Sequence, residues 1–300
     1  MNFLLTGSSG FLGKTVYDRL KLNNKVLSLG RGKSHDFSVN DLIDTSNLAG
    51  LKKDINVVVH IAGLAHKNPQ KESDKQAFDK VNYEGTRSLC EWIEKWLKKP
   101  ESFIFISSVS VYGRETGLNI SEEEELNGNS SYAFSKVKAE QYLIEWGKKL
   151  GIKILILRLP LIIGSNPPGN LGKMILGIKR GTYFSIGGGK AKKSMVLAED
   201  VADLIAGCPD ISGIYNLTDG YHPSFSELES IVCSKLKKDK PFNMPIGLAK
   251  LLGKIGDFLP LFPVNSDTIN KISKDLTFSD LKARQELGWN PSRVIDKFRI

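Results

Sequence analysis

The sequence predicts an α/β fold in which a doubly wound parallel sheet is combined with a smaller C-terminal lobe. Short apolar, β-branched segments alternate with segments of helical periodicity through the first half of the chain, which is typical of βαβ units. Residues 57–59 and 154–157 are uninterrupted apolar runs, as expected for strands buried on both faces of a sheet. A glycine-rich loop joins the first expected strand to the first expected helix.

The elements follow one another in a regular order as far as Pro160. Strands are expected at residues 2–7, 25–30, 55–63, 102–113 and 152–160, and helices at 11–23, 77–99 and 131–151. Gly- and Pro-rich loops then break the alternation, although residues 194–205 and 213–220 still resemble sheet-linked segments. We therefore expect a first domain over residues 1–165, rejoined by about 194–218, and a discontinuous second lobe over 166–300.

Composition restricts the class of protein. A chain of 300 residues with 41% hydrophobic and 25% charged residues is typical of a soluble globular protein. The N-terminus lacks the pattern of a signal peptide or anchor, and three cysteines without a C-x-x-C pair suggest reduced thiols in a cytoplasm. No metal-ligand pattern stands out, so we expect no metal site.

Charge and one apolar stretch bear on the partners. The net charge of +9 favours anionic partners, but the Lys pairs are scattered along the chain, so we expect no nucleic-acid binding. Residues 246–262 are apolar but are interrupted by Lys250, Lys254 and Asp257, so no stable membrane insertion is expected. This stretch could touch a membrane surface, but packing onto its own domain is the favoured interpretation.

The loop after the first strand, TGSSGFLGKT, places Gly7, Gly10 and Gly13 between a strand and a helix. In a Rossmann-type dinucleotide fold, such glycines allow a tight turn and bring a diphosphate close to backbone N–H groups. The end of this loop also resembles a P-loop, but Ser8 stands where the first glycine of that motif belongs. His60, in the next strand, stands where a metal-holding Asp would be wanted, so the P-loop is disfavoured.

The end of the second strand bears on the type of dinucleotide. No acidic residue is present there for the ribose hydroxyl of NAD, and Arg31 is followed by Lys33 and Ser34. Arg31 slightly favours NADP(H) over NAD(H), because an Arg accommodates the additional phosphate. Asp41 and Leu42, after the next short strand, are candidates to face the adenine.

Several motifs together resemble the extended short-chain dehydrogenase/reductases known as NAD-dependent epimerases/dehydratases. They are TGSSGFLG, VVHIAG, VNYEGT, FISSVSVYG, SYAFSK, RLPLIIG, SMVLAEDVAD and SDLKARQELGWNP, and they follow the family's order over nearly the whole chain. The resemblance implies an NAD(P)-binding Rossmann domain followed by a substrate-binding lobe.

The resemblance also implies the catalytic roles. Tyr132 corresponds to the acid/base, Lys136 to its partner, and Ser108 to the hydroxyl that holds the substrate oxygen. A free tyrosine has a pKa of about 10, and we expect the neighbouring ammonium and the positively charged nicotinamide ring to favour its phenolate.

The cofactor and substrate residues carried over from the family extend along the chain. The cofactor set is Gly7, Ser9, Gly10, Phe11, Leu12, Gly13, Arg31, Asp41, Leu42, Ile61, Ala62, Gly63, Asn82, Ser107, Tyr132, Lys136 and Leu159. The substrate set is Ser108, Tyr132, Asn170, Leu171 and Lys193, the last three being expected at a diphosphate. Lys193 stands where many relatives have an Arg, so the bidentate contact of that Arg is lost.

Departures from the family pattern narrow the expected reaction. Val109 and Ser110 replace the Asp-Glu pair of the 4,6-dehydratases, so a dehydratase is not expected. Ala65 and Pro160 differ from the residues usual in relatives of galactose epimerase. The resemblance therefore favours a 4-ketoreductase or 4-epimerase acting on a UDP- or dTDP-sugar in bacterial surface-polysaccharide synthesis.

Three questions stay open at this point. A non-catalytic dinucleotide sensor or scaffold is the alternative function, although the intact Ser108, Tyr132 and Lys136 disfavour it. A homodimer through the helix at 77–99 and the Tyr132 helix is implied by the resemblance. His60 is expected to be a packed strand residue, and His66 could reach the active site.

Overall fold

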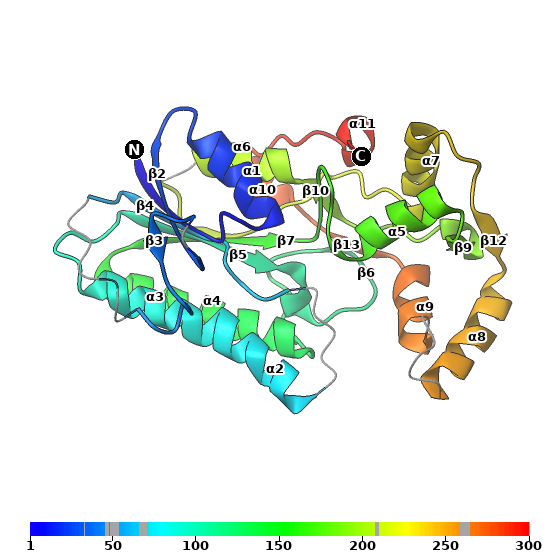
Figure 1. Ribbon diagram of the computed structural model, residues 1–300, viewed down its shortest axis with the longest axis horizontal. Coiled ribbons are helices and arrows are strands. Elements are labelled where there is room, and N and C mark those ends of the chain that lie inside the picture. Colours follow the sequence, from blue (N-terminus) through cyan, green and yellow to red (C-terminus); the bar gives the residue numbers. More distant parts are fainter. Residues whose placement is uncertain are drawn as a thin grey trace.

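The fold is described here from a computed structural model, which covers residues 1–32, 34–45, 48, 54–65, 71–207, 210–258 and 265–299. Seven strands form one sheet in the order β11-β7-β5-β4-β1-β2-β3, and every neighbouring pair is parallel (Figure 1). The strands are β1 (Asn2–Thr6), β2 (Lys25–Gly30), β3 (Phe37–Ser38), β4 (Val57–His60), β5 (Ser102–Ser108), β7 (Lys153–Leu159) and β11 (Gly213–Asn216). The predicted doubly wound α/β fold is confirmed.

Helices cover both faces of this sheet, as its apolar strands require. One face carries α1 (Phe11–Leu20), α6 (Ala198–Gly207) and α10 (Leu281–Leu287), and the other α2 (Glu72–Phe78), α3 (Gly85–Glu94) and α4 (Ser131–Leu150) (Figure 1). Side chains alternate between the two cores: Phe103 and Phe105 face α3 and α4, whereas Ile104 and Ile106 face α1 and α6. The sheet is thus buried on both faces.

The predicted helix at 77–99 has a different form in the structure. It begins earlier, as α2, continues through a π-helix at Asp79–Glu84, and then continues as α3, which ends at Glu94. The predicted strand at 102–113 ends at Ser108, because a 3-10 turn at Val109–Tyr112 follows, with the Ser108 side chain accepting a hydrogen bond from the N–H of Ser110.

The second lobe lies at the carboxyl end of the sheet, toward which the arrowheads of β5 and β7 point (Figure 1). It contains three two-stranded parallel sheets, β10-β8, β12-β9 and β13-β6, in which β6, β8 and β10 come from residues predicted for the first domain. Its strands are β6 (Gly117–Ile120), β8 (Leu161–Ile163), β9 (Phe184–Ile186), β10 (Met195–Leu197), β12 (Phe242–Met244) and β13 (Leu276–Phe278). Its helices are α5 (Gly169–Arg180), α7 (Phe225–Leu236), α8 (Ile246–Phe258), α9 (Ser266–Ser273) and α11 (Val294–Lys297), with a 3-10 turn at Gly187–Gly189.

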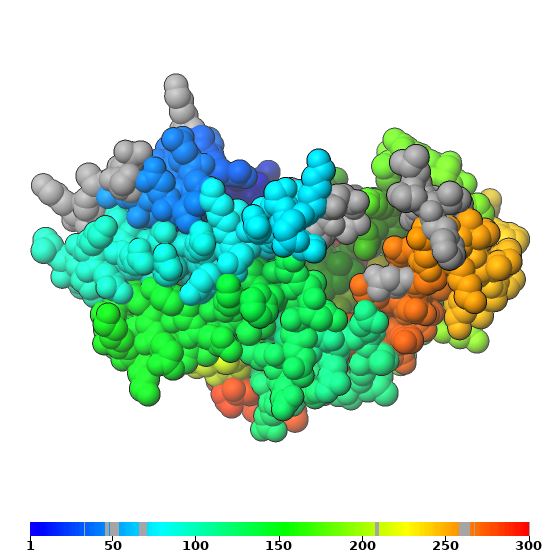
Figure 2. Space-filling model, turned by 90° about the horizontal axis from the view of Figure 1, so that it is seen from below, coloured from blue at the N-terminus to red at the C-terminus, as the bar shows by residue number. Residues whose placement is uncertain are grey.

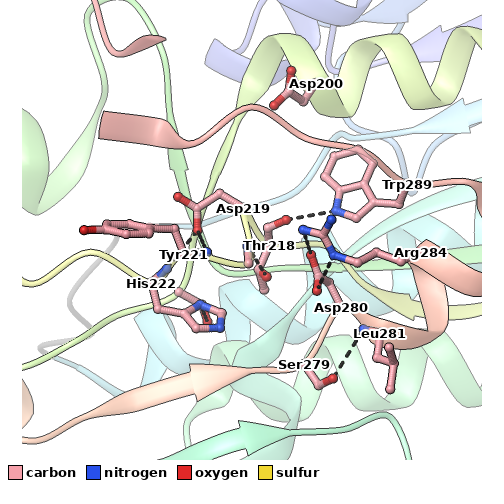
Figure 3. Close-up of polar contacts among 12 residues, drawn as sticks. Asp200, Thr218, Asp219, Tyr221, His222, Ser279, Asp280, Leu281, Arg284 and Trp289 are labelled. Atoms are coloured by element: carbon pink, nitrogen blue, oxygen red, sulfur yellow. Dashed lines mark hydrogen bonds and ion pairs between the residues drawn. The ribbon is translucent and has the colours of Figure 1, made fainter. Parts of the chain in front are cut away.

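A polar cluster fastens the C-terminal segment to the loop after β11 (Figure 3). Asp219 accepts hydrogen bonds from the N–H groups of Tyr221 and His222 with one carboxylate oxygen and from that of Val294 with the other, each at 3.1 Å. The indole N–H of Trp289 donates to the carbonyl of Thr218 at 2.9 Å (Figure 3). The motif SDLKARQELGWNP therefore ties the end of the chain to the central sheet.

The two parts of the molecule enclose a recess. In Figure 2 the first domain, in blue to green, and the orange segment of α8 and α9 stand on either side of it. No helix among the described residues is both long and apolar enough to cross a membrane.

Candidate active site

The glycine loop lies where the sheet changes direction. The chain runs from β1 outward to β2 and β3, and then returns to β4 on the other side of β1, so the crevice between β1 and β4 is the switch point of the fold. Gly7 has a φ of +76°, and a Cβ there would lie 2.7 Å from the N atom of Ala62. A Cβ on Gly13 would lie 1.9 Å from the carbonyl oxygen of Gly7. A side chain does not fit at either of these two positions, so Gly7 and Gly13 are required there.

The N-terminus of α1 follows the loop directly. Its N-cap is Gly10, which offers no side-chain hydrogen bond, and the first turn contains no acidic residue. The N–H groups at the start of the helix therefore have no side-chain acceptor, and together with the helix dipole they favour an anion. Ser9 and Phe11 lie at this position, and Leu12 is buried in the core below it.

Asn82 connects the end of β4 to helix α4. Its side-chain oxygen accepts from the N–H of Leu64 at 2.7 Å, and its amide donates to the carbonyl of Leu64 at 3.1 Å and to the hydroxyl of Ser135 at 3.0 Å. Asn82 lies in the π-helix, a rare geometry that is frequent at functional sites. A Cβ on Gly63 would lie 3.0 Å from Oδ1 of Asn82 and 3.5 Å from Nζ of Lys136. The loop after β4, with Ile61 and Ala62, is thereby held against α4.

Ser108, Tyr132 and Lys136 converge at the carboxyl end of β5. Ser108 is the last residue of β5, and Tyr132 and Lys136 lie in the first two turns of α4, whose N-cap Ser130 accepts from the N–H of Ala133. Tyr132 is half-buried and within hydrogen-bonding reach of Ser108. The ammonium of Lys136 donates to the carbonyl of Ile106 at 2.8 Å and lies 4.4 Å from the ring centre of Phe105. The structure thus brings the three predicted catalytic residues together.

Burial disfavours the charged forms of both Tyr132 and Lys136, so that the pKa of Tyr132 rises and that of Lys136 falls. Burial raises the pKa of Tyr132, and the hydrogen bond with Ser108 opposes that rise. Burial also lowers the pKa of Lys136 to about 8, whereas the charge of Glu140 raises it. Burial therefore outweighs the hydrogen bond with Ser108, and the expected effect of the Lys136 ammonium and of the nicotinamide ring on the phenolate stays a prediction.

A buried ion pair behind the site was missed by sequence reasoning. Arg158, at 2% side-chain exposure, donates to Glu140, at 1%, through Nη2 at 2.6 Å and through Nε at 3.2 Å. Ser107 donates a short hydrogen bond to the same carboxylate, and Arg158 also donates to the hydroxyl of Tyr112 at 3.0 Å. Glu140 follows Lys136 by four residues, so the shared helix face was the available signal. This pair locks α4 to the ends of β5 and β7.

The other predicted residues lie farther along the edge of the site. Arg31 is exposed at the end of β2, whereas Asp41 forms a long ion pair with Lys80, at 3.9 Å, and the side chain of Leu42 is buried in the core. Ser8, in the glycine loop, lies 3.2 Å from the ring of His35. Ser8 and His35 therefore join Arg31 as polar groups near the expected ribose.

The residues predicted for a diphosphate belong mainly to the second lobe. Asn170 is exposed in the first turn of α5, and the side chain of Leu171 is buried in the core of that lobe. Lys193 is half-buried, which lowers its pKa to about 8. Leu159, at the end of β7, packs in the core of the first domain.

Of the two histidines singled out in the sequence, only His60 lies within the described residues. His60 is fully buried, and its ring lies 2.7 Å from the hydroxyl of Thr6 and 3.0 Å from that of Thr86. The prediction that His60 is a packed strand residue is confirmed. Burial, with a smaller contribution from the charge of Lys136, lowers its pKa to about 3. His66 lies outside the described residues, as does Lys33. The described residues contain no cluster of potential metal ligands.

Comparisons with known proteins agree on a family and a fold. The model of the NAD dependent epimerase/dehydratase family matches residues 3–207. The chain is 26% identical to a UDP-glucose 4-epimerase of Vibrio cholerae, over 99% of this chain and 92% of that one. It is also 26% identical to the N-acetyl-alpha-D-glucosaminyl-diphospho-ditrans,octacis-undecaprenol 4-epimerase of Escherichia coli O157:H7, over 86% of this chain and 80% of that one. A UDP-glucuronic acid 4-epimerase from Bacillus cereus, solved with UDP-glucuronic acid and NAD, superposes with a TM-score of 0.79 at 20% identity, covering 99% of this chain and 96% of that one.

Proposed function

This chain belongs to the NAD-dependent epimerase/dehydratase family and is an enzyme of the extended short-chain dehydrogenase/reductase type, and from that premise we propose that it carries out hydride chemistry at C4 of a hexose in a UDP- or dTDP-sugar. The observation that carries this proposal is the convergence of Ser108, Tyr132 and Lys136 beside a glycine loop at the switch point of the sheet. The named 4-epimerases among its relatives support C4 as the site of reaction.

The residues present fit a nicotinamide dinucleotide. The backbone of Gly7 and Gly13 and the uncapped N-terminus of α1 would hold the diphosphate, and Gly63 would leave room next to Lys136. NAD(H) and NADP(H) both stay candidates, and Arg31 slightly favours NADP(H). When bound, the cofactor supplies the hydride acceptor and a positive charge.

Proton transfer is assigned to Tyr132. In the proposed reaction its phenolate takes the proton of the C4 hydroxyl during oxidation, and its hydroxyl returns a proton to the C4 oxygen during reduction. The hydroxyl of Ser108 would hold that oxygen, since Ser108 is within hydrogen-bonding reach of Tyr132. Because burial raises the pKa of Tyr132, its ionisation requires positive charge in the assembled site, which the bound cofactor would supply and which the nearby ammonium of Lys136 is proposed to reinforce.

A substitution at Tyr132 tests this assignment. The assay incubates the purified protein with a panel of UDP- and dTDP-hexoses and their 4-keto derivatives, and follows both the C4 epimers by NMR and the near-ultraviolet absorbance of reduced nicotinamide. We expect Tyr132→Phe to lower kcat by about 10²- to 10⁴-fold, the usual contribution of general acid–base catalysis. Tyr142→Phe, on the same helix, is the matched control. An unchanged rate in Tyr132→Phe would refute the assignment.

The same assay separates an epimerase from a reductase. An epimerase returns the hydride to its substrate and keeps its cofactor, so cofactor is released only when the protein is denatured. A reductase exchanges its cofactor in every turnover, so reduced cofactor is consumed in proportion to product. Tight dinucleotide binding without turnover on any sugar would favour a sensor or scaffold instead.

The carrier of the sugar has a second candidate, a polyprenyl diphosphate. The Escherichia coli relative is named for such a substrate, and α8 carries large exposed apolar side chains, which is unusual for an enzyme of freely diffusing substrates. Comparing a UDP-hexose with the same hexose on a polyprenyl diphosphate in detergent decides between the carriers.

The setting of the enzyme follows from these substrates. We propose a cytoplasmic enzyme of surface-polysaccharide synthesis, since activated sugars are made and used there.

The exposed Phe134 and Ile144 on α4 support a homodimer through α4 and the helix that contains Asn82. Light scattering of the purified protein measures its mass directly.

A further inference from the structure

Helix α8 buries small residues and exposes several large apolar residues. Ala249 and Gly253 are buried, and a Cβ on Gly253 would lie 3.2 Å from the backbone of Ser266 at the start of α9. In contrast, Leu251 is 57% exposed and Ile255 is 41% exposed. A helix that packs onto its own domain normally buries its large apolar side chains. The expected packing of this helix onto its own domain therefore holds for Ala249 and Gly253, whereas its stripe of large apolar side chains faces outward.

The exposed apolar surface extends beyond this helix. Leu248 lies on the same stripe at 47% exposure, since residues 248, 251 and 255 share one side of an α-helix. Strands β9 and β12 precede α8 and lie at the same end of the molecule (Figure 1). They expose Phe184 and Phe242, whose rings meet edge to face. We call Phe184, Phe242, Leu248, Leu251 and Ile255 the apolar tip. Isolated exposed apolar residues are normal, but such a group at one end of a lobe marks an interaction surface.

The segment around α8 is rich in lysine. Residues 235–274 contain eight Lys and three Asp, without Arg or Glu. Lys250 and Lys254 lie on α8 itself, one turn apart and beside the apolar stripe, and both are exposed. An apolar stripe flanked by lysines is the pattern of a helix that lies in the plane of a membrane surface with its cations among anionic headgroups.

We propose that the apolar tip docks on an anionic lipid bilayer, with α8 lying in the headgroup region. The charge selects this partner over a second copy of the chain, because a two-fold contact through this surface would place the lysines of one copy against those of the other. The docking is peripheral, consistent with the finding that no described helix could cross a membrane.

Vesicle binding tests the proposal with the full-length protein. The measurement is co-sedimentation with vesicles of phosphatidylcholine alone and of phosphatidylcholine mixed with phosphatidylglycerol, at low and high salt. We expect binding to the mixed vesicles, which weakens with salt because the lysines act through screened charge. Protein that stays in the supernatant with both vesicle types overturns the proposal.

Two variants assign the binding to the tip. Leu251→Asp/Ile255→Asp is expected to lose at least tenfold in affinity for the mixed vesicles, and Lys250→Glu/Lys254→Glu at least 25-fold, since each lysine near such a surface contributes about fivefold. Leu281→Asp, at a site of equal exposure (58%) on α10, is the matched control and is expected to bind like the wild type. Circular dichroism melting confirms that each variant is folded.

The alternative occupants give distinct results. Equal binding by wild type and both tip variants would place the contact elsewhere and overturn the proposal. A dimer in light scattering that becomes a monomer in Leu251→Asp/Ile255→Asp would identify a second copy as the occupant and overturn it as well. Because sedimentation needs no turnover, its outcome is independent of the function proposed above.

Discussion

Replacing Lys136 by Met is expected to make the protein more stable at neutral pH while removing its activity. The ammonium of Lys136 is buried, and burial lowers its pKa from 10.5 to about 8. At pH 7 the folded state therefore holds a charge that the unfolded state holds at lower free energy. A difference of about 2.5 pKa units corresponds to about 3 kcal/mol at 1.36 kcal/mol per unit. Replacing a catalytic group that destabilises the folded state is expected to raise the free energy of unfolding.

The hydrogen bond of Lys136 reduces this gain. Met cannot donate to the carbonyl of Ile106, and the loss of that bond costs about 1 to 2 kcal/mol. The net expectation at pH 7 is a free energy of unfolding about 1 to 2 kcal/mol above that of the wild type. The cost of losing this hydrogen bond does not depend on pH, whereas the cost of burying the charge of Lys136 does.

The pH dependence provides the sharper test. Because the folded pKa of Lys136 lies below the unfolded one, the wild type gains stability as the pH rises from about 8 toward 10.5. The advantage of Lys136→Met should therefore fall by about 2 kcal/mol between pH 7 and pH 9.5. Urea unfolding at both pH values measures it, with Lys138→Met, a half-exposed lysine on the same helix, as the matched control. A difference between Lys136→Met and wild type that does not change with pH would refute the reasoning.

Three further predictions concern the buried groups around the site. Because the pKa of His60 is depressed in the folded state, stability present above pH 6.5 is lost as the pH falls toward 3. His60→Gln should therefore reduce the slope of the unfolding free energy against pH, measured with urea in this range, by up to about 1.4 kcal/mol per pH unit. An unchanged slope would contradict this. Glu140→Gln leaves the guanidinium of Arg158 buried without a carboxylate and should lower the unfolding free energy by about 3 to 5 kcal/mol. The double variant Glu140→Gln/Arg158→Met should restore part of this loss in urea unfolding. A double variant that is no more stable than Glu140→Gln would argue against the buried charge as the cause. Gly13→Ala should abolish dinucleotide binding in a fluorescence titration, because its Cβ would collide with the loop, whereas Gly207→Ala, in open space, should bind normally; binding by both variants would show that the loop can yield.

The local part of this structure could be predicted from the sequence. Continuous apolar runs identified β4 and β7, and the loop glycines marked the start of α1, because these signals lie within a few residues of one another. Tyr132 and Lys136 were placed on one helix by their spacing, whereas Ser108 was identified by the family resemblance, because its strand was predicted to extend to residue 113.

What could not be predicted depends on residues that meet only in the folded chain. Glu140 and Arg158 come from different elements, and nothing in either local pattern specifies their pairing. The direction of the pKa shift of Tyr132 required its burial, which spacing does not reveal. The outward stripe of Leu251 and Ile255 has the same periodicity as an inward one, so the sequence pattern could not tell which side of α8 faces water.

The π-helix at Asp79–Glu84 makes the length of this segment as important as its composition. A π turn accommodates one residue more than an α turn, because its hydrogen bonds run from i to i+5 rather than i to i+4. Deleting one residue here would let α2 and α3 merge into a single regular helix and would remove the wide turn that positions Asn82. Asn82 could then no longer face Leu64 and Ser135 while the two flanking helices keep their packing. A change in the length of this segment is thus expected to disturb the hydrogen bonds of Asn82 as much as a substitution of Asn82 itself.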